Sequence, residues 1–378
     1  MLKKVLILGH GDATQFIDVY NQYVEIFQRQ GYHVTTAFLT GQPNPISHNR
    51  SLADQTIFLN FSSNYIRNLK IAAIKKVLSL CRAEQFQMVI CHRYKPTFIM
   101  LLVAKFYKVP VLFSVMHELN AFKSIRRRLM VGLLAPKNMY FAGVSQAVTN
   151  DLRQKLWRIN DDNIRTLYNM IDVEATEKLL LSREEARQTL GLKPNEIVFG
   201  NIARLAKNKD HGSLINAFAQ VKVDYPNAKL IIMGDGSLQA SLQHLCQQLG
   251  LQDVIFTGFL PQAVRFMRAF DCFVLTSTQE AFGRVLLEAM VARLPIIATQ
   301  VNGIPEVVGD SGILVPPKHP QILAKSMKHI ASISLDERSK SGDRCYERAV
   351  KHFSIPVFHK QFWSLPLLQP FKENASCT

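Results

Sequence analysis

Two glutamates on either side of a glycine have the residue types and spacing to hold a sugar. Glu280 precedes an expected helix and Glu288 lies about one turn inside it, so both carboxylates can face one side. Gly283 lets the backbone approach a ligand closely, and the free N–H groups of the first helical residues can bind an anion. Those first residues are Arg284, Val285 and Leu286. Carboxylates that bind sugar hydroxyls, next to backbone amides that bind phosphate, suit a nucleotide-sugar. Taken alone, however, two such glutamates are more often an exposed helical residue and a partner of the helix dipole.

Glu280, Glu288 and Gly283 must be positioned by the strands and helices around them. The sequence predicts these elements from short apolar runs that alternate with helical patterns. The first series predicts buried strands at Val5–Leu8, Val34–Phe38, Ile57–Phe61, Met88–Cys91, Val111–Val115 and Met139–Val144. Between them, apolar residues at helical spacing predict helices at Thr14–Gln30, Ile66–Ala83, Pro96–Tyr107 and Lys123–Leu134. This alternation predicts a parallel sheet covered by helices on both faces. The pattern pauses over residues 151–185, which are more polar.

The alternation then starts again, which indicates a second domain of the same kind. Its expected strands are Ile197–Asn201, Lys229–Met233, Val254–Phe256, Phe273–Leu275, Ile296–Thr299 and Ile313–Val315. Its expected helices are His211–Asp224, Leu238–Leu249, Gly283–Ala292 and Gln321–Ser332. We therefore expect an α/β protein with two Rossmann-like, doubly wound domains, residues 1–175 and 176–350, that face each other across a ligand-binding cleft. Residues 351–378 are expected to form a helical tail, broken at Pro356 and Pro366, that packs back on the N-terminal domain.

The composition is that of a well-buried globular protein with an excess of positive charge. Of 378 residues, 48% are apolar and 20% are charged, which excludes a disordered chain and predicts about two domains. Six cysteines without a C-x-x-C pair favour buried thiols in a reducing compartment over a disulfide scaffold or a zinc site. The net charge of +16 indicates an anionic partner, which could be nucleic acid, anionic lipid or a phosphorylated molecule. The excess is larger in residues 1–180 than beyond them.

An ordered series of short motifs runs from the first of the two glutamates to Pro317. It comprises Glu280-Ala281-Phe282-Gly283, Glu288-Ala289-Met290, Leu294-Pro295-Ile296-Ile297-Ala298-Thr299, Asn302-Gly303-Ile304-Pro305-Glu306 and Gly312-Ile313-Leu314-Val315-Pro316-Pro317. The series resembles the retaining glycosyltransferases of family 4, which have the two-domain GT-B fold. The resemblance is dense over 196–330, whereas 1–195 match only in layout. It implies a nucleotide-sugar-dependent hexosyltransferase in which Glu280 is catalytic and positions sugar hydroxyls and Glu288 binds the nucleotide ribose.

The resemblance extends upstream of these motifs. Arg204, after Gly200-Asn201-Ile202-Ala203, and Lys209 look like the family's Arg/Lys pair, which neutralises the donor diphosphate as its charge develops. Solvated surface charge is the alternative for each. The resemblance also implies that Gly283 and the backbone amides of the first helical residues bind the same diphosphate. Gly234, in a strand that ends in Gly-x-Gly, is implied to shape the nucleotide pocket, and the segment that resembles the family's base-binding backbone is Gly258-Phe259-Leu260.

The N-terminal half carries weaker matches. His117 follows an expected strand where the family often has a histidine near the transferred sugar, although a lone histidine there is more often structural. The first loop, Gly9-His10-Gly11, departs from the family's Gly-Gly-rich loop, so acceptor residues do not carry over. Arg93 and Lys95, at another strand end, are our candidates with Gly11 for binding an anionic acceptor.

Two basic segments suggest contact with a membrane. In the first, apolar residues recur at helical spacing among four cations, Arg67, Lys70, Lys75 and Lys76. The second contains Arg126, Arg127 and Arg128. Either segment alone is at least as well explained by a domain-packing helix with a solvated basic side. Together they fit docking on anionic lipid head groups, at about 1 kcal/mol per basic residue.

The expected location is the cytoplasm. The apolar run Val5–Leu8 is too short for a secretory signal, and Phe98–Ala104 is too short to span a bilayer. We expect a cytoplasmic protein that can associate peripherally with the inner membrane. The leading hypothesis is a retaining glycosyltransferase that moves a hexose-type sugar from a nucleotide-diphosphate donor to a glycan or lipid-linked acceptor, as in bacterial lipopolysaccharide or capsule biosynthesis.

Other classes of protein stay open as alternatives. A nucleotide-sugar epimerase of the same fold would interconvert the free nucleotide-sugar without an acceptor. A nucleic-acid-binding protein is supported only by the charge, so nucleic acid is not an expected partner. An oxidoreductase would need a G-x-G-x-x-G after the first strand, which the sequence lacks. No aspartate pair ends a strand, so we expect neither metal nor cofactor, and both single and double displacement would give retention.

Overall fold

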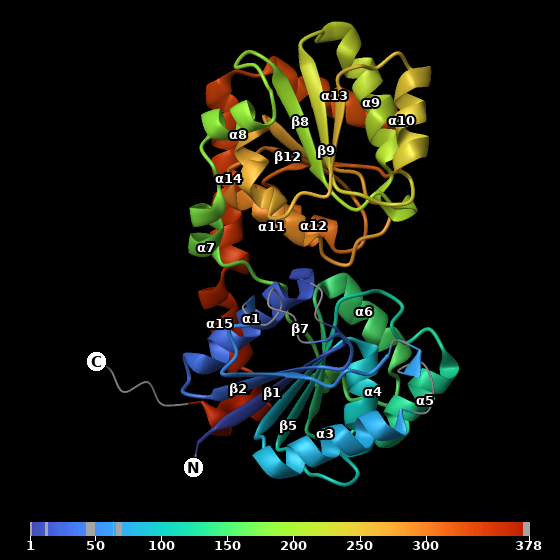
Figure 1. Ribbon diagram of the computed structural model, residues 1–378, viewed down its shortest axis with the longest axis vertical. Coiled ribbons are helices and arrows are strands. Elements are labelled where there is room, and N and C mark those ends of the chain that lie inside the picture. Colours follow the sequence, from blue (N-terminus) through green and yellow to red (C-terminus); the bar gives the residue numbers. More distant parts are fainter. Residues whose placement is uncertain (1, 12–13, 43–49, 63, 66–69, 373–378) are drawn as a thin grey trace, which may run out of the picture. The chain divides into compact units, whose positions relative to one another are not determined.

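The computed structural model describes residues 2–11, 14–42, 50–62, 64–65 and 70–372. The chain divides into two compact units, which can be followed by colour in Figure 1. Unit 1 contains the residues up to Met170 and those from Ile355 onward, and unit 2 runs from Ile171 to Ser354. The chain therefore passes from unit 1 into unit 2 and back again.

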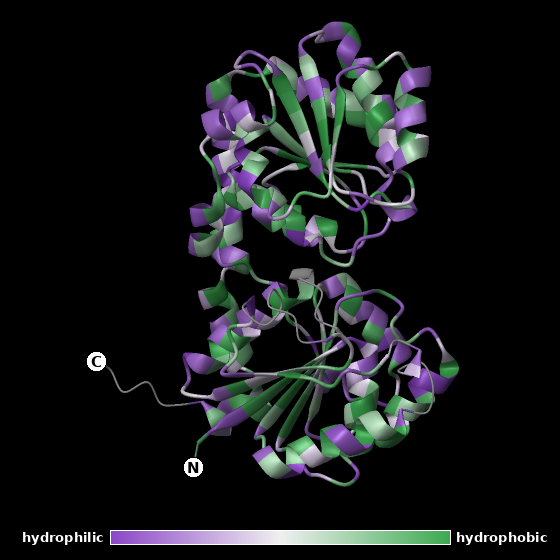
Figure 2. Cartoon of the chain, in the orientation of Figure 1, coloured by the Kyte–Doolittle hydropathy of each residue, from purple (hydrophilic) through white to green (hydrophobic). Residues whose placement is uncertain are grey.

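Unit 1 is built on a parallel sheet. Among the described residues this sheet has seven strands in the order β3-β2-β1-β4-β5-β6-β7. The strands are β1 (Lys4–Gly9), β2 (His33–Phe38), β3 (Gln55–Phe58), β4 (Met88–His92), β5 (Val111–Met116), β6 (Met139–Gly143) and β7 (Ile164–Thr166). Strands β4, β5 and β6 are buried along their whole length, as expected where helices cover both faces. Figure 2 shows the same apolar character along the strands.

Helices cover both faces of this sheet. They are α1 (Thr14–Gln28), α3 (Ile71–Glu84), α4 (Tyr94–Val103), α5 (Ile125–Leu134), α6 (Gln146–Lys155) and α15 (Ile355–Trp363). Helix α1 packs on β1 and β2, and α4 packs on β4 and β5. The crossover from β1 to β2 and the crossover from β4 to β5 run in opposite directions along the sheet, so right-handed connections put α1 and α4 on opposite faces (Figure 1).

Unit 2 repeats the design. Its described residues form a six-stranded parallel sheet in the order β10-β9-β8-β11-β12-β13. The strands are β8 (Ile197–Ile202), β9 (Ala228–Met233), β10 (Val254–Gly258), β11 (Cys272–Leu275), β12 (Ile296–Thr299) and β13 (Ile313–Val315). The helices are α7 (Val173–Leu179), α8 (Arg183–Thr189), α9 (His211–Asp224), α10 (Gln239–Gln248), α11 (Arg284–Val291), α12 (Ile304–Val308), α13 (Pro320–Ser332) and α14 (Leu335–Phe353). Both expected series of strands, and the α/β class with it, are thus confirmed.

The expected pause over residues 151–185 is wrong. This stretch holds the end of α6, the short strand β7, helix α7 and the start of α8. Some of its polar residues cap helices: the side chain of Asp172 accepts from the N–H of Ala175, and Ser182 forms a capping box with Glu185. Short, capped elements therefore give the same polar composition as a loop.

Helix α15 belongs to unit 1 although it follows unit 2 in the chain. Phe362 and Trp363 lie edge-on to Phe27 of α1, with ring centroids 5.5 and 5.7 Å away, and all three side chains are buried. Phe358 makes a similar contact with Tyr23, at 5.3 Å. The core of unit 1 is therefore completed by residues that come after unit 2.

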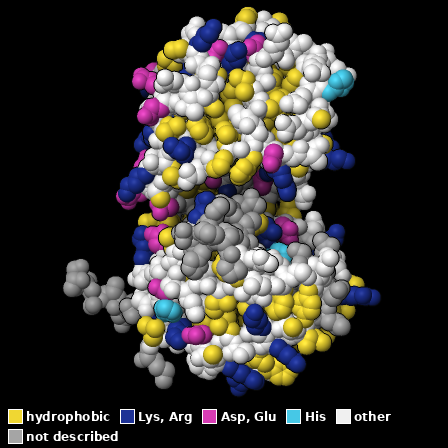
Figure 3. All heavy atoms as spheres, viewed as in Figure 1, with side chains coloured by type: hydrophobic (Ala, Val, Ile, Leu, Met, Phe, Trp, Pro, Cys, Tyr) yellow, Lys and Arg dark blue, Asp and Glu magenta, His cyan; other side chains and the backbone are white. Residues whose placement is uncertain are grey.

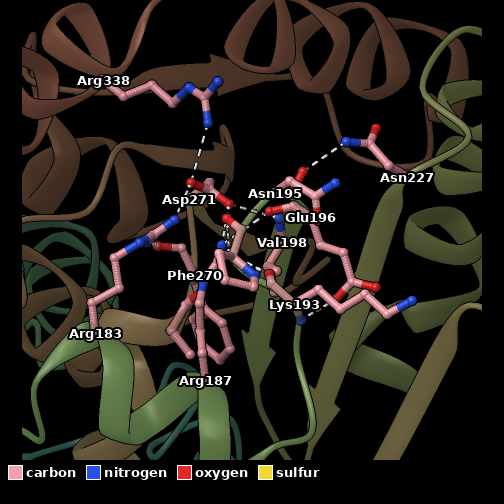
Figure 4. Close-up of polar contacts among 12 residues, drawn as sticks. Arg183, Arg187, Lys193, Asn195, Glu196, Val198, Asn227, Phe270, Asp271 and Arg338 are labelled. Atoms are coloured by element: carbon pink, nitrogen blue, oxygen red, sulfur yellow. Dashed lines mark hydrogen bonds and ion pairs between the residues drawn. The ribbon is translucent and has the colours of Figure 1, made fainter.

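A buried carboxylate fixes the amino-terminal edge of the sheet in unit 2. The side chain of Asp271, which is 4% exposed, accepts hydrogen bonds from Arg183 (2.7 Å), Arg187 (2.8 Å) and Arg338 (3.1 Å). It also accepts from the backbone N–H of Val198 in β8, at 2.8 Å. Figure 4 shows how these side chains converge on Asp271. Helices α8 and α14 are thereby tied to the same end of the sheet.

Candidate functional site

The candidate residues of unit 2 come together at one edge of its sheet. Arg204 follows β8, Gly234 follows β9, Gly258 ends β10, and Glu280 lies in the loop after β11. These four strands are neighbours in the order β10-β9-β8-β11 and are parallel, so their carboxyl ends meet at a common edge. This is the edge at which open α/β sheets bind ligands.

Glu280 and Lys209 form an ion pair at this edge. The carboxylate Oε2 of Glu280 contacts Nζ of Lys209, and both side chains are mostly buried, at 18% and 17% exposed. The same oxygen accepts from Oγ of Ser277 at 3.2 Å. The two charges, which the resemblance assigns to different parts of a donor, therefore neutralise each other in this structure.

Backbone contacts hold the two loops that carry this pair. The carbonyl of Lys209 accepts from Oγ1 of Thr276 at 2.8 Å, and the N–H of Thr278 donates to the carbonyl of Asn208 at 2.8 Å. On the other side, the N–H of Glu280 donates to Oδ1 of Asn302, and the carbonyl of Glu280 accepts from the N–H of Gly303. Glu280 is thus fixed from both directions.

Sequence reasoning had not assigned these supporting contacts. Asn302 lies in the motif series that carries the resemblance, whereas Ser277 lies three residues before the series begins, and the sequence predicts a role for neither. Ser277 lies two residues after β11 and Asn302 two residues before α12. A short polar side chain at such a position is the signal that identifies them, because it can bind nearby backbone or carboxylate groups.

Gly283 begins helix α11 in a conformation that suits glycine. Its φ of 89° is left-handed, and a Cβ built there would lie 3.5 Å from Cγ of Glu280. No acidic residue occupies the first turn of α11, which starts at Arg284 and continues through Val285 and the buried Leu286. Glu288, one turn further, is half-buried. The carboxylate of Glu280 and the N-terminus of α11 therefore lie beside each other. A ligand with hydroxyl groups next to an anionic group can bind both, its hydroxyls at the carboxylate and its anion at the helix N-terminus.

The Gly-x-Gly turn after β9 supports the Arg204 loop. Gly234 and Gly236 have φ of 139° and 154°, and a Cβ on either would lie 2.1 Å from the carbonyl oxygen of Ala203 or 2.3 Å from that of Leu205. The N–H of Leu205 donates to the carbonyl of Asp235 at 2.7 Å. The turn thus packs directly against the residues on both sides of Arg204, whose side chain is exposed.

The β10 segment offers an exposed aromatic ring. Gly258 has a φ of 69°, and its carbonyl accepts from the N–H of Gly234 at 2.9 Å. Phe259 follows with 69% of its surface exposed, and Leu260 is half-buried. An exposed ring beside the nucleotide turn can stack on a base.

The candidate residues of unit 1 also follow strands. His117 comes directly after β5, and its Nε2 lies 2.9 Å from Nδ1 of His92, the last residue of β4. His92 is buried between the rings of Tyr20 and Tyr23, and burial, then His117 and Arg93, hold the pKa of His92 well below its usual value. In the sequence, His92 stands only within the cationic strand end that contains Arg93 and Lys95, and its contact with His117 depends on β4 and β5 being neighbours in the sheet.

Arg93 combines unusual backbone with an unusual environment. Its φ is 74°, a backbone conformation that residues other than glycine rarely adopt. Its guanidinium carbon lies 3.9 Å from the ring centre of Phe16. Its Nε is buried and has no hydrogen-bond partner in the part of the chain that the structure describes. Lys95 and Gly11 are half-buried near the same strand ends. Strain and an unsatisfied donor at one residue are more often found at functional sites than elsewhere.

The basic residues considered for membrane contact have different environments. Lys75, Lys76 and Arg126 are exposed, whereas Lys70, Arg127 and Arg128 are half-buried. The last two donate to the carbonyls of Ala121 (2.7 Å) and Phe122 (2.9 Å). Arg67 lies outside the described residues.

The apolar positions of α3 and α5 also differ. Ala73 and Val77 of α3 are fully buried, so this part of α3 packs on the core. Helix α5 instead exposes Ile125, Leu129 and Leu133, four residues apart each time. Figure 3 shows hydrophobic and basic side chains side by side on this part of unit 1.

Unit 2 has a pocket at the opposite edge of its sheet. It encloses about 280 Å³ next to Asp271 and Pro295, which precede β11 and β12, and is lined also by Arg183, Arg268 and Arg338. The guanidinium groups of Arg183 and Arg338 already donate hydrogen bonds to backbone carbonyls and to Asp271. We therefore interpret the arginines of this pocket as structural. Within the described residues, no group of three or more His, Cys, Asp or Glu side chains could hold a metal ion. None of the described helices has the length and hydropathy of a membrane span.

Two protein-family models match the chain one after the other. The model described as Glycosyltransferase Family 4 matches residues 22–175, and the model described as Glycosyl transferases group 1 matches residues 182–352. The chain is 30% identical over 219 residues to the N-acetylgalactosamine-N,N'-diacetylbacillosaminyl-diphospho-undecaprenol 4-alpha-N-acetylgalactosaminyltransferase of Campylobacter jejuni, which covers 57% of each protein. The chain spans about half the length of the curated relatives it matches.

Solved structures resemble the chain over nearly its whole length. A glycosyltransferase from Rickettsia africae superposes with a TM-score of 0.85 at 15% identity, over 99% of this chain and 100% of that one. The Anabaena protein Alr3699/HepE, solved in complex with UDP, superposes with a TM-score of 0.81 at 20% identity, over 96% and 98%. At these identities the likeness shows a shared fold.

Proposed function

Because the chain belongs to the group 1 glycosyltransferases and has the GT-B fold, we propose that it moves a hexose-type sugar from a nucleotide-diphosphate donor to a glycan or lipid-linked acceptor, with retention of configuration. The observation that carries the proposal is the ion pair of Glu280 and Lys209 beside the N-terminus of α11. It puts a carboxylate for sugar hydroxyls next to a cation and backbone amides for phosphate.

The ion pair suggests how donor binding prepares the site. The donor diphosphate attracts Lys209 and Arg204, and contact with it draws Lys209 away from Glu280. The carboxylate, still held by Ser277 and by its backbone contacts, is then available to the sugar hydroxyls. As the glycosidic bond breaks, charge develops on the diphosphate, where the two cations and the N–H groups at Gly283 and Arg284 stabilise it.

The remaining donor contacts follow the nucleotide along the edge. Glu288 accepts from the ribose hydroxyls, the Gly234 turn leaves room for the nucleotide, and Phe259 stacks on the base between Gly258 and Leu260. The relative from Anabaena was solved with UDP, which makes uridine nucleotides the first donors to test.

In a single displacement, retention requires attack on the face from which the leaving group departs. In our proposal a phosphate oxygen of the leaving diphosphate accepts the acceptor proton, and His117 contacts the transferred sugar. The cations Arg204 and Lys209 do the electrostatic work that a metal ion does in other enzymes, so transfer should continue in excess EDTA.

The acceptor is proposed to be lipid-linked and the pathway to be bacterial cell-surface polysaccharide synthesis. The relative from Campylobacter is named for a diphospho-undecaprenol acceptor, which supports this choice. We propose that the enzyme works in the cytoplasm at the inner membrane. The exposed Ile125, Leu129 and Leu133 of α5, with Arg126 beside them, have the composition of an interfacial helix.

A donor assay tests the proposal directly. The enzyme is incubated with UDP-sugars, and UDP release is measured with and without membrane-derived acceptor lipid. We expect release from at least one donor, a loss of 100-fold or more, on the order expected for a transition-state contact, in Glu280→Gln, and full activity in the exposed control Glu184→Gln. Equal activity of Glu280→Gln and the control would refute the assignment. Interconversion of the UDP-sugar without acceptor would identify an epimerase instead.

A further inference from the structure

The loop after β12, residues 300–303, lies against the loop that carries Glu280. The N–H of Gly303 donates to the carbonyl of Glu280 at 3.1 Å. A Cβ built on Gly303 would lie 2.1 Å from the carbonyl oxygen of Ala281, so the two backbones are in direct contact. Any side chain that this loop presents at the edge of the sheet therefore lies close to Glu280.

Asn302 presents its amide at this point in a fixed orientation. Its Oδ1 accepts from the backbone N–H of Glu280 at 3.2 Å. Because an N–H group can only donate, the amide atom that faces it must be the oxygen, and Nδ2 is left on the other side of the amide. The backbone of Asn302 has a φ of 44°, a left-handed conformation that asparagine adopts more readily than most residues.

Glu280 and Asn302 each keep one polar group that is available to a ligand. Oε2 of Glu280 contacts Lys209 and Ser277, but Oε1 has no hydrogen-bond partner in the part of the chain that the structure describes. Nδ2 of Asn302 likewise has no partner among the described residues, and this side chain is exposed. The site therefore offers a free acceptor on Glu280 and two free N–H donors on Asn302, the residue bonded to it.

An acceptor beside a donor matches two neighbouring oxygens of a sugar. A hydroxyl group can donate to Oε1 of Glu280, while the oxygen on the adjacent ring carbon accepts from Nδ2 of Asn302. That second oxygen can belong to a hydroxyl or to the carbonyl of an acetamido group, since both are acceptors. A site that makes such a hydrogen bond discriminates against an analogue that lacks the oxygen, because its polar group is then left unpaired.

We propose that Asn302 contacts the transferred sugar, through an oxygen next to the hydroxyl that Glu280 binds, and so selects donors that carry an oxygen at that position. The inference rests on the proposed function, because it concerns the donor sugar of that reaction. The competing role is purely structural: Asn302 would only hold the backbone of Glu280, and Oδ1 alone would matter.

The variant Asn302→Asp separates these two roles. Aspartate has nearly the same shape and keeps an oxygen for the N–H of Glu280, but it has no N–H group for the sugar. Affinities are measured by calorimetry for UDP and for a panel of UDP-glucose, UDP-galactose and their N-acetylhexosamine counterparts. We expect the dissociation constant of the UDP-sugar, divided by that of UDP, to rise about tenfold, as for one lost hydrogen bond. The added negative charge acts on both ligands, so this ratio largely cancels it.

Two further variants complete the comparison. Asn302→Gly fits the left-handed backbone without strain and removes the whole amide, so the ratio should rise in the same way. Asn195→Asp makes the same charge change at an exposed position before β8 and should leave the ratio unchanged. An unchanged ratio in Asn302→Asp would overturn the proposal, whether or not Asn302→Gly is affected, because the structural role predicts that result.

Analogues of the sugar identify the contact. With monodeoxy forms of the UDP-sugar that binds, the wild type should lose about tenfold in affinity at the ring position that Asn302 contacts, and Asn302→Asp should lose nothing further there. Equal losses in both proteins at every ring position would contradict the contact. A chain that binds UDP but no UDP-sugar, or neither, would instead refute the proposed function and this inference with it.

Discussion

Nδ1 of His92 lies 2.9 Å from Nε2 of His117, and the two imidazole rings are stacked with their centres 5.2 Å apart. One ring is fully buried at the end of β4, and the other begins the loop after β5. Because burial keeps His92 neutral, a single proton occupies the hydrogen bond between them. His92 is therefore in a position to fix the orientation and tautomer of His117.

Replacing His92 should test this positioning role. We expect His92→Phe to lower kcat for transfer about tenfold with little change in the donor KM, because it removes the hydrogen bond that orients His117. His92→Asn, whose amide can replace Nδ1, should restore much of the loss. Nitrogen NMR of the histidine rings provides a check that does not depend on activity, since the tautomer of His117 should change in His92→Phe alone. An unchanged His117 signal in that variant would remove the basis for the role.

Lys209 and its neighbour Lys207 provide a matched pair of variants. Both lie in one turn of 3-10 helix, but only Lys209 pairs with Glu280. We expect Lys209→Gln to lower kcat by about 100-fold or more, in the range found when one group that stabilises developing charge is removed. Lys207→Gln, at an exposed position, should stay within about twofold of the wild type. Single-turnover UDP release measures both, and equal losses would point to general electrostatics in place of a specific contact.

Gly234 should tolerate no side chain. In Gly234→Ala the new Cβ would meet the carbonyl oxygen of Ala203 at 2.1 Å, so the turn and the Arg204 loop must separate. Gly250 has a positive φ of 67° but nothing within 4 Å of a Cβ, so Gly250→Ala isolates the cost of backbone strain, about 1 kcal/mol. We expect thermal unfolding to show a clearly larger loss for Gly234→Ala, together with weaker UDP binding. Similar losses in both variants would mean that the turn can shift.

His211 should make unit 2 sensitive to acid. Its side chain is buried with Nε2 3.1 Å from Oδ1 of Asn201, and burial, then Lys209, lower its pKa from 6.5 to about 4. As the pH falls below ~6.5, His211 becomes protonated in the unfolded chain but stays neutral in the folded protein. The contribution of neutral His211 to the free energy of unfolding is therefore complete above pH ~6.5 and is lost as the pH falls towards ~4. The loss from this one group is on the order of 2–3 kcal/mol.

The variant His211→Gln keeps a donor at the position of Nε2 and cannot titrate. We expect its free energy of unfolding in urea to fall less between pH 7.5 and 4.5 than that of the wild type. His244→Gln, at an exposed position on α10, serves as the control and should follow the wild type. Parallel pH curves for all three proteins would show that His211 does not contribute.

The exposed face of α5 should determine membrane binding. We expect Leu129→Ser with Leu133→Ser to reduce partition into phosphatidylglycerol vesicles about tenfold, because burying two leucines in the interface contributes at least 1–2 kcal/mol. Leu335→Ser, an exposed leucine of unit 2, is the control. Wild-type binding that is as strong to neutral vesicles as to anionic ones, or that persists in the double variant, would contradict a basic, apolar docking face.

The strands and the site loops could be read from the sequence because both depend on local patterns. Ile313–Val315 and His211–Asp224 form with the bounds that their apolar spacing predicts, and the candidate residues follow strands as expected. The short elements β7 and α7 were missed because their caps, such as Asp172, have the composition of a loop.

The contacts that define the site could not be read in the same way. Lys209 and Glu280 are 71 positions apart and meet only because β8 and β11 are neighbours in the sheet, and His92 meets His117 because β4 and β5 are neighbours. Strand order depends on packing of the whole unit. The left-handed backbone of Arg93 is also invisible in the sequence, since any residue but glycine is unfavourable there.

The return of the chain to unit 1 has a consequence for how the protein is made. A ribosome releases residues in order, so all of unit 2 emerges before Phe362 and Trp363, which complete the core of unit 1 around Phe27. Throughout that interval the nascent chain must leave an aromatic surface of unit 1 uncovered. The first unit to be translated is then the last to finish folding, and this surface is where a cell's chaperones would be expected to bind first.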